Sequence, residues 1–227
     1  MPIADTLARF DIPEVAAGER ITGFVGLVVQ PDAITIRRSY ELAAAVMPTG
    51  GELVLAPGLL PHVTLTQCAL RDAPRERVAA YVQRLGEQLR GRTIPLGAVA
   101  AFGGGFVFWC VDPASPERAL LRRVHEDALT VAEGFLDPVA NRAVVEGTMK
   151  MSNNDEVLVG NARRYGYAFV NDRYLPHITL GFDPRLAIDP PSGSGWNPRA
   201  HQHAMTVERV VAVRLGRHAR AEQVLAL

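Results

Sequence analysis

Two short segments of the sequence are almost identical, and each contains a histidine. LPHVTL occupies residues 60–65 and LPHITL occupies residues 175–180, so that they differ only in Val63 against Ile178. Side chains on a β-strand alternate between faces with a period of two, so in each copy the histidine and the threonine two residues later share one face. These polar pairs are His62 with Thr64 and His177 with Thr179.

If the fold brings the two copies together, two imidazoles and two hydroxyls converge on one site. This arrangement suits displacement at phosphorus, because one histidine can act as the base and the other as the acid near neutral pH. The threonine hydroxyls can donate hydrogen bonds to the non-bridging phosphate oxygens. The sequence therefore predicts a catalytic pair and two phosphate ligands, without a metal and without an assignment of acid and base: His62 and His177, with Thr64 and Thr179.

Thr66 continues the alternation of the first motif. It has the same strand parity as His62 and Thr64, so it either lines the same cleft or is an ordinary surface threonine. His201 and His203 are also two residues apart, but no cysteine or acidic cluster accompanies them. We therefore expect a pair at the edge of a loop there, not a metal site.

The remaining sequence predicts an irregular order of strands and helices. β-rich segments bounded by turn residues predict strands at 21–31, 51–57, 61–70, 93–102, 106–112, 173–182, 205–216 and 222–227. Apolar residues at helical spacing predict helices at 33–47, 73–91 and 115–135, and a weaker helix from Ser152 to residue 166. Ser115 is a candidate N-cap, and Ser152 has capping-box spacing with Asp155. The segment 188–198 predicts a loop.

This order favours an α+β fold with antiparallel sheets, because strands and helices do not strictly alternate. A chain of 227 residues can form one large domain or two small lobes. Since the hexapeptide occurs twice, we expect one domain over residues 1–227, made of two lobes. The lobes divide near residue 100, into roughly 1–100 and 101–227, and strands can be exchanged between them.

Composition narrows the class of protein. Hydrophobic residues make up 48% and charged residues 21% of the chain, which is typical of a soluble globular protein. No apolar segment has the length of about 20 residues that a membrane helix needs, and the first residues do not read as a signal peptide. The two cysteines, Cys68 and Cys110, fit a reducing cytoplasm. We therefore expect a cytoplasmic protein with no membrane partner, and a monomer.

The formal net charge is zero. Proteins that bind long nucleic acids usually carry a basic surplus, because neutralisation of phosphates drives that binding. The charge therefore argues against a partner such as a long duplex. It leaves open an enzyme that holds a single phosphate, a nucleotide or the end of an RNA.

The two motifs, PHVTL and PHITL, make the chain resemble the two-histidine (2H) phosphoesterase superfamily. The segment RYGYAFVNDRYLPHITLGF, residues 164–182, also resembles bacterial members that are similar to 2′-5′ RNA ligases or cyclic phosphodiesterases. The resemblance covers residues 20–227, and its specificity lies in the two motifs. It implies a bilobal α+β fold, in which two antiparallel sheets with flanking helices surround a central cleft.

The resemblance also implies an activity: hydrolysis or transesterification of 2′,3′-cyclic phosphates or 2′-5′ linkages in nucleotides or RNA ends, without a metal or cofactor. Carried over to this chain, it makes His62 and His177 the acid/base pair. Some members have a basic residue directly after the second motif, where this chain has Gly181 and Phe182. The cation that pairs with the phosphate is therefore unassigned, and the candidates by residue type are Lys150, Arg164 and Arg173.

Other functions stay open at this point. The chain can be a binding module that holds a nucleotide or phosphate without turnover, or a 2H enzyme that acts on cyclic dinucleotides or another small phosphodiester. A metalloenzyme with histidine ligands needs more ligands than the two motifs supply.

Overall fold

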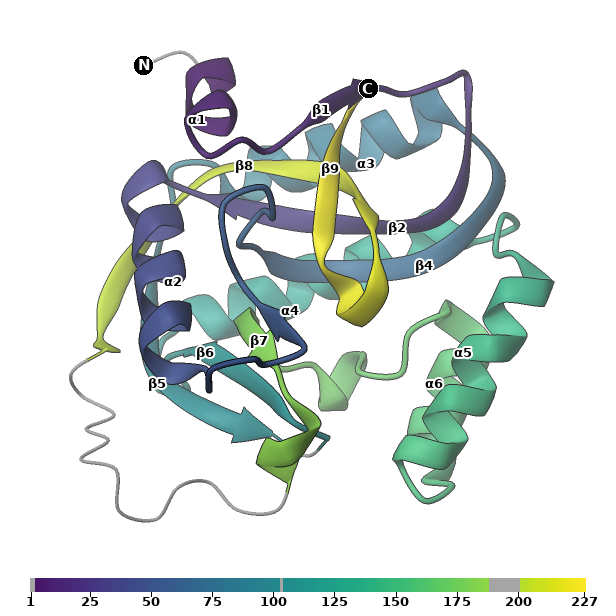
Figure 1. Cartoon of the computed structure of the whole chain (residues 1–227). Helices are drawn as coiled ribbons and strands as arrows, with labels where there is room; N and C mark the ends of the chain where they lie inside the picture. Colours follow the sequence, from purple (N-terminus) through teal and green to yellow (C-terminus); the bar gives the residue numbers. More distant parts are fainter. Residues whose placement is uncertain (1–2, 103, 188–200) are drawn as a thin grey trace.

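The computed structural model describes residues 3–102, 104–187 and 201–227, and it shows an α+β arrangement (Figure 1). The strands are β1 (Glu14–Ala16), β2 (Arg20–Pro31), β3 (Leu53–Val54), β4 (Val63–Pro74), β5 (Thr93–Phe102), β6 (Phe106–Val111), β7 (His177–Phe182), β8 (His203–Leu215) and β9 (Ala221–Ala226). The α-helices are α1 (Ile3–Arg9), α2 (Ala33–Val46), α3 (Arg75–Leu89), α4 (Glu117–Ala128), α5 (Pro138–Met151) and α6 (Glu156–Tyr165). The predicted α+β class is confirmed. None of the helices in these ranges is long and apolar enough to cross a membrane.

The described strands belong to one connected sheet. Its order is β1-β9-β8-β2-β4-β7-β6-β5, with β3 paired to β7 and with β5 also paired to β8. Each of these pairings is antiparallel except that of β1 with β9. Because β5 returns to β8, the strands from β8 to β5 form a closed circuit, and β3 and the β9-β1 pair are side branches.

The circuit has two halves, β8-β2-β4 and β7-β6-β5, which meet at two junctions. At the first junction β4 and β7 share one described residue pair, Val63 with Ile178. At the second, residues 93–96 of β5 pair with residues 203–206 of β8. The two antiparallel sheets expected from the sequence are thus two paired halves of one sheet. The division into lobes near residue 100 stays a prediction.

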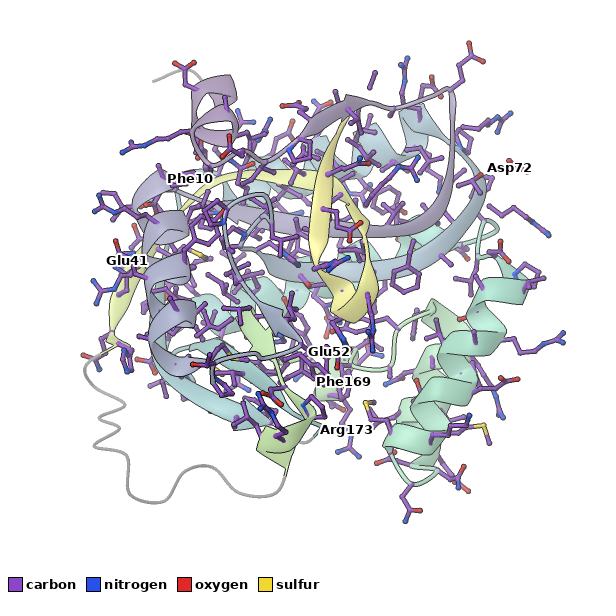
Figure 2. All side chains as sticks on the ribbon, in the orientation of Figure 1. Phe10, Glu41, Glu52, Asp72, Phe169 and Arg173 are labelled. Atoms are coloured by element: carbon purple, nitrogen blue, oxygen red, sulfur yellow. The ribbon has the colours of Figure 1, made fainter. Side chains whose placement is uncertain are left out.

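Helices cover the sheet, and polar or aromatic contacts hold the ends of some of them. α3 packs on β8, α4 packs on β4, and α2 contacts β7 and β8. Asp32 caps α2, because its Oδ1 accepts hydrogen bonds from the amides of Ile34 and Thr35, both at 3.0 Å. Phe10, labelled in Figure 2, connects the end of α1 to α2 by an edge-on ring contact with Tyr40, with centroids 5.7 Å apart.

α5 and α6 form a helical hairpin at the edge of the molecule (Figure 1). The helix predicted from Ser152 to residue 166 is present as α6, but it begins at Glu156, so Ser152 does not start it. Ser152 follows the last residue of α5 and its hydroxyl donates to the carbonyl of Thr148 at 2.7 Å. Asp155 caps α6 instead, since its Oδ1 accepts from the amides of Val157 and Leu158 at 2.9 and 3.1 Å. α5 was not predicted, because its buried residues do not form an apolar stripe.

Other boundaries differ from the predictions in smaller ways. The helix expected at 115–135 ends as α4 at Ala128 and continues as a 3₁₀ helix, Leu129–Ala132. Ser115 still acts at its start, because its hydroxyl accepts from the amide of Glu117 at 3.1 Å. The strand expected at 51–57 is only two residues long, and the loop expected at 188–198 lies outside the described residues.

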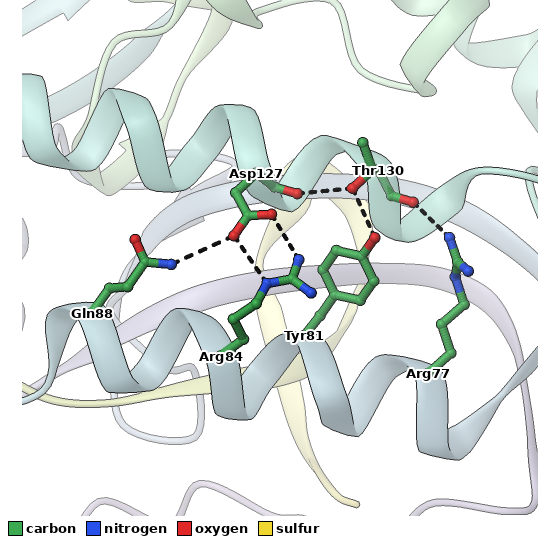
Figure 3. A network of polar contacts seen from close by, with 6 residues as sticks. All are labelled: Arg77, Tyr81, Arg84, Gln88, Asp127 and Thr130. Carbon is green, nitrogen blue, oxygen red and sulfur yellow. Dashed lines mark hydrogen bonds and ion pairs between the residues drawn. The ribbon is translucent and has the colours of Figure 1, made fainter.

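A polar network joins α3 to the end of α4 (Figure 3). Arg84 donates two hydrogen bonds to the carboxylate of Asp127, from Nε at 3.1 Å and from Nη2 at 2.7 Å. The hydroxyls of Tyr81 and Thr130 lie 2.7 Å apart, and Nη2 of Arg77 donates to the carbonyl of Thr130 at 2.8 Å. Beside this exposed network, Leu85 and Leu89 of α3 are completely buried. We therefore expect apolar burial, and not the ion pair, to hold α3 on the sheet.

Two substitutions in this region test that expectation. Asp127→Asn removes a surface ion pair and is expected to lower the free energy of unfolding by no more than about 1 kcal/mol. Leu85→Ala leaves a cavity in the core and is expected to lower it by about 2–5 kcal/mol. Urea denaturation at pH 7 measures both values, and a larger effect from Asp127→Asn contradicts the expectation.

Candidate functional site

The two His-x-Thr motifs are brought together by the junction of β4 and β7. Val63 pairs with Ile178 in antiparallel register, and both side chains are completely buried. Antiparallel strands run in opposite directions, so the residue before Val63 lies opposite the residue after Ile178. This register therefore sets each histidine opposite the threonine of the other motif: His62 lies opposite Thr179, and His177 lies opposite Thr64.

These four polar side chains share the face opposite to Val63 and Ile178. On such a face, the Cβ atoms of directly opposite residues lie about 4.5–5.5 Å apart and diagonal neighbours about 7–8 Å apart. His62 and His177 occupy the diagonal. Of the four side chains, His62 and Thr179 line a pocket, and His177 and Thr64 are not among its lining residues. The rings also interact electrostatically, since positive charge on His62 lowers the pKa of His177.

Each imidazole is oriented by the main chain two residues before it. Nδ1 of His62 lies 2.8 Å from the carbonyl oxygen of Leu60, and Nδ1 of His177 lies 2.6 Å from that of Leu175. A carbonyl can only accept, so Nδ1 carries the hydrogen in both rings and Nε2 is left to exchange a proton. The ring of Phe108 stacks on His177 with centroids 3.6 Å apart. The Leu-Pro that precedes each histidine thus belongs to the motif, because the leucine carbonyl orients the ring.

Burial favours the neutral form of both imidazoles. It lowers the pKa of His62 from its usual value of 6.5, against the hydrogen bond to Leu60, which raises it. It lowers the pKa of His177 to about 4, and the nearby His62 lowers it further, against the hydrogen bond to Leu175. In the free protein both rings are therefore neutral at pH 7, and an anion between them would favour the protonated form of one ring.

A small pocket with a volume of about 20 Å³, partly open to solvent, adjoins the motifs. His62 and Thr179 line it together with the turn between β8 and β9 and with a group of leucines. The lining residues are Leu53, Leu55, Leu59, Leu60, His62, Thr179, His218, Ala219, Arg220 and Ala221. None of these is acidic, so the described wall of the pocket suits an anion. His218 and Arg220 were missed in the sequence, because they lie in no motif and only the chain path brings them here.

Thr64 and Thr66 differ from Thr179 in their surroundings. Thr64 is half-buried and its carbonyl accepts a hydrogen bond from the hydroxyl of Tyr174 at 2.9 Å. Thr66 is 2% exposed and is not among the residues that line the pocket, so its role as a cleft residue stays a prediction.

Buried His125 of α4 connects β4 to the segment that leads into the second motif. Its Nδ1 donates to the carbonyl of Leu65 at 2.5 Å, and its Nε2 accepts from the amide of Asn171 at 3.1 Å. Its ring stacks on Tyr174 with centroids 3.9 Å apart and planes within 2°. Because Tyr174 also bonds to Thr64, these contacts hold the approach to His177 against β4, the strand that begins directly after His62.

The basic residues suggested as phosphate partners lie elsewhere. Arg173 pairs with Asp155 at 3.2 Å, the guanidinium of Arg164 lies over the ring of Tyr165, and Lys150 is in the last turn of α5. None of the three is among the residues that line the pocket. The described part of the chain has no cluster of three or more histidine, cysteine or acidic residues that could hold a metal ion.

No model of a protein family and no curated protein sequence matches this chain. Solved structures do resemble it. E. coli LigT complexed with NADP⁺ is 17% identical, with a TM-score of 0.50 over 91% of this chain and 96% of that one. E. coli LigT in apo form is 19% identical, with a TM-score of 0.46 over 91% and 96%. A phosphoesterase is 18% identical, with a TM-score of 0.44 over 90% and 96%.

The first of these comparisons shows that the chain has the fold of E. coli LigT. It confirms, at the level of the fold, the resemblance to the 2H phosphoesterases that the two motifs predicted. A shared fold does not by itself assign an activity.

The contacts of His125 predict how stability depends on this residue. His125→Phe keeps a ring against Tyr174 and removes both hydrogen bonds, so a buried carbonyl and a part-buried amide each lose this partner. We expect it to lower the free energy of unfolding by about 2–4 kcal/mol at pH 7. Tyr174→Phe removes one hydroxyl and is expected to cost about 1 kcal/mol.

We also expect His125→Phe to change how the free energy of unfolding depends on pH. Burial lowers the pKa of His125 in the folded protein below its usual value of 6.5. The neutral ring therefore contributes its full stability above pH 6.5 and less as the pH falls below it. We expect the stability of His125→Phe, measured by urea denaturation, to fall less between pH 7 and pH 5 than that of the wild type. Equal slopes would contradict the buried neutral state of His125.

Proposed function

We propose that the chain is a 2H phosphoesterase that hydrolyses or transesterifies phosphodiesters by general acid/base catalysis with two histidines. The observation that carries the proposal is the register of Val63 with Ile178, which sets two His-x-Thr motifs side by side on one face. The orientation of both rings by leucine carbonyls supports it, since Nε2 is the proton-exchanging atom in each. A purely structural pair of histidines would not need the same orientation twice.

In this mechanism the phosphodiester binds between the two rings. The neutral imidazole takes a proton at Nε2 from a water molecule or a ribose hydroxyl, whose oxygen attacks phosphorus. The second imidazole, protonated at Nε2, gives its proton to the leaving ribose oxygen as the P–O bond breaks. Thr64 and Thr179 donate hydrogen bonds to the non-bridging oxygens and stabilise the charge that develops there. The chain's own residues thus supply both proton transfers.

The substrate class that we propose is a nucleotide or an RNA end with a 2′,3′-cyclic phosphate or a 2′-5′ linkage. E. coli LigT, whose fold the chain shares, has been solved with NADP⁺, and this supports a nucleotide by analogy only. The pocket adds an observation of this chain: it is small, and its described lining contains histidine and arginine but no acid. A pocket of this size can contact one small anionic group and does not receive a long duplex.

Removal of either catalytic histidine tests the proposal. We expect His62→Ala and His177→Ala each to lower kcat by about 10²–10⁴-fold, because each removes one proton transfer. The assay is a panel of 2′,3′-cyclic nucleotides, 2′-5′ dinucleotides and cyclic dinucleotides, with and without a metal chelator. His203→Ala is the matched control, since this histidine contacts Thr35 and Trp109 and not the motifs.

The outcomes separate the alternatives. Activity that resists the chelator and disappears in both motif variants supports the two-histidine mechanism. Activity that the chelator abolishes and that both variants retain would contradict it. Binding of nucleotides without turnover on the whole panel would favour the binding module.

The pH dependence of kcat/KM gives a second test. The active free enzyme has one neutral and one protonated imidazole, and burial lowers the pKa of both His62 and His177 below 6.5. We therefore expect kcat/KM to be highest below pH 6.5 and to fall about tenfold per pH unit at higher pH, as the acid loses its proton. Initial rates between pH 4 and pH 9 at low substrate concentration measure it. An optimum above pH 7 would show that the free enzyme's acid is not one of these rings.

A further inference from the structure

The proposed site lacks a cation at the position where the resemblance would place one. Gly181 follows the second motif, and it could not be replaced by a larger residue without a change in its surroundings. A Cβ atom there would lie 2.6 Å from the carbonyl oxygen of Leu53 and 2.6 Å from the side chain of Met47. The positive charge for a bound phosphate must therefore come from another part of the chain.

We propose that Arg220, on the turn between β8 and β9, binds a non-bridging oxygen of the substrate's phosphate. This inference rests on the proposed phosphoesterase function of the site. Arg220 lines the same pocket as His62 and Thr179, whereas Lys150, Arg164 and Arg173 do not. Its guanidinium is always charged and its N–H groups match the oxygens of a phosphate.

The main chain fixes Arg220 relative to the first catalytic histidine. The amide of Leu60 donates to the carbonyl of Ala221 at 3.0 Å, and these two residues form an isolated antiparallel bridge. The carbonyl of Leu60 accepts the hydrogen bond from Nδ1 of His62. Leu60 therefore connects the two parts of the site: its carbonyl binds the ring of His62, and its amide binds Ala221, the residue after Arg220.

The turn itself is held in a conformation that costs energy. His218 and Ala219 have φ values of 58° and 55°, a left-handed backbone that costs non-glycine residues about 1–3 kcal/mol each. The ring of His218 stacks on Phe182 of β7 with centroids 4.1 Å apart, and its Nε2 lies 3.1 Å from Glu52. Glu52, labelled in Figure 2, also pairs with Arg217. Contacts from β7 and from the segment before β3 thus keep the turn at the pocket.

In the free protein Arg220 has a weak partner. Its Nε donates to Oε1 of Glu222 at 2.5 Å, and the two side chains are 43% and 39% exposed. An ion pair so exposed contributes only about 0–1 kcal/mol. A phosphate held in the pocket by His62 and Thr179 can therefore replace Glu222, or share the guanidinium with it, at little cost.

Substitutions at two arginines of the same turn test the proposal. Arg220→Met is expected to lower kcat/KM by about 10- to 100-fold, the usual effect of losing a charged hydrogen bond. Arg220→Lys is expected to recover part of this loss, because lysine keeps the charge without the planar fork. Arg217→Met is the control: it removes the same charge from a residue that pairs with Glu52 and does not line the pocket, while His218 still holds the turn to Glu52. We expect it to change kcat/KM by less than about threefold.

Binding of inorganic phosphate separates this proposal from the proposed function. By calorimetric titration, Arg220→Met should weaken phosphate binding about tenfold or more, and Arg217→Met should leave it close to that of the wild type. If the wild type binds phosphate but turns over none of the substrates, the proposed function fails. The comparison of phosphate binding between the wild type and Arg220→Met still tests the role of Arg220. If the wild type is active and Arg220→Met matches it in kcat/KM and in phosphate binding, the role of Arg220 is overturned. An equal loss of phosphate binding in Arg220→Met and Arg217→Met would also overturn it, because the effect would then come from the total charge of the turn and not from a contact made by Arg220.

Discussion

The site depends on one residue pair, Val63 opposite Ile178 at the junction of β4 and β7. Both side chains are buried, so this register is fixed by the core and not by the polar residues that it positions. A slip of one residue would turn every side chain of the slipped strand to the other face, which would expose the apolar side chain and bury the histidine and threonine. The packing that stabilises the junction therefore also sets the geometry between the two motifs.

Burial has a second consequence for the proposed chemistry. It lowers the pKa of both imidazoles, while the leucine carbonyls that orient the rings raise it. In the free protein the first effect is larger, so the pair is neutral at pH 7. The negative charge of a bound phosphodiester opposes the desolvation and favours a proton on one ring. Substrate binding and the protonation of the acid are then coupled, and a neutral ligand of the same shape would not produce the active state.

Support for the site comes from elements that carry no motif. His125 and Tyr174 hold the approach to the second histidine, through two hydrogen bonds to main-chain atoms and a stacking contact. The turn between β8 and β9 contributes the wall with Arg220, and Leu60 connects that turn to the ring of His62. The chain has zero net charge, but this turn places His218 and Arg220 at a pocket whose described lining contains no acidic residue. Selectivity for a small anion can therefore arise locally, without a basic surface.

The sequence by itself determined the α+β class, the two strands β8 and β9 at the end of the chain, and the two motifs, because strand periodicity and a repeated phrase are local properties. It did not predict α5, which buries Asn141 and Thr148 but no apolar stripe. It also placed the start of α6 at Ser152, whereas Asp155 is the capping residue. Only the tertiary structure decided that Leu60 and Leu175 orient the histidines, that Thr66 is buried and that Arg220 reaches the pocket. These facts depend on contacts between residues far apart in the chain, and no spacing along a single sequence specifies such contacts.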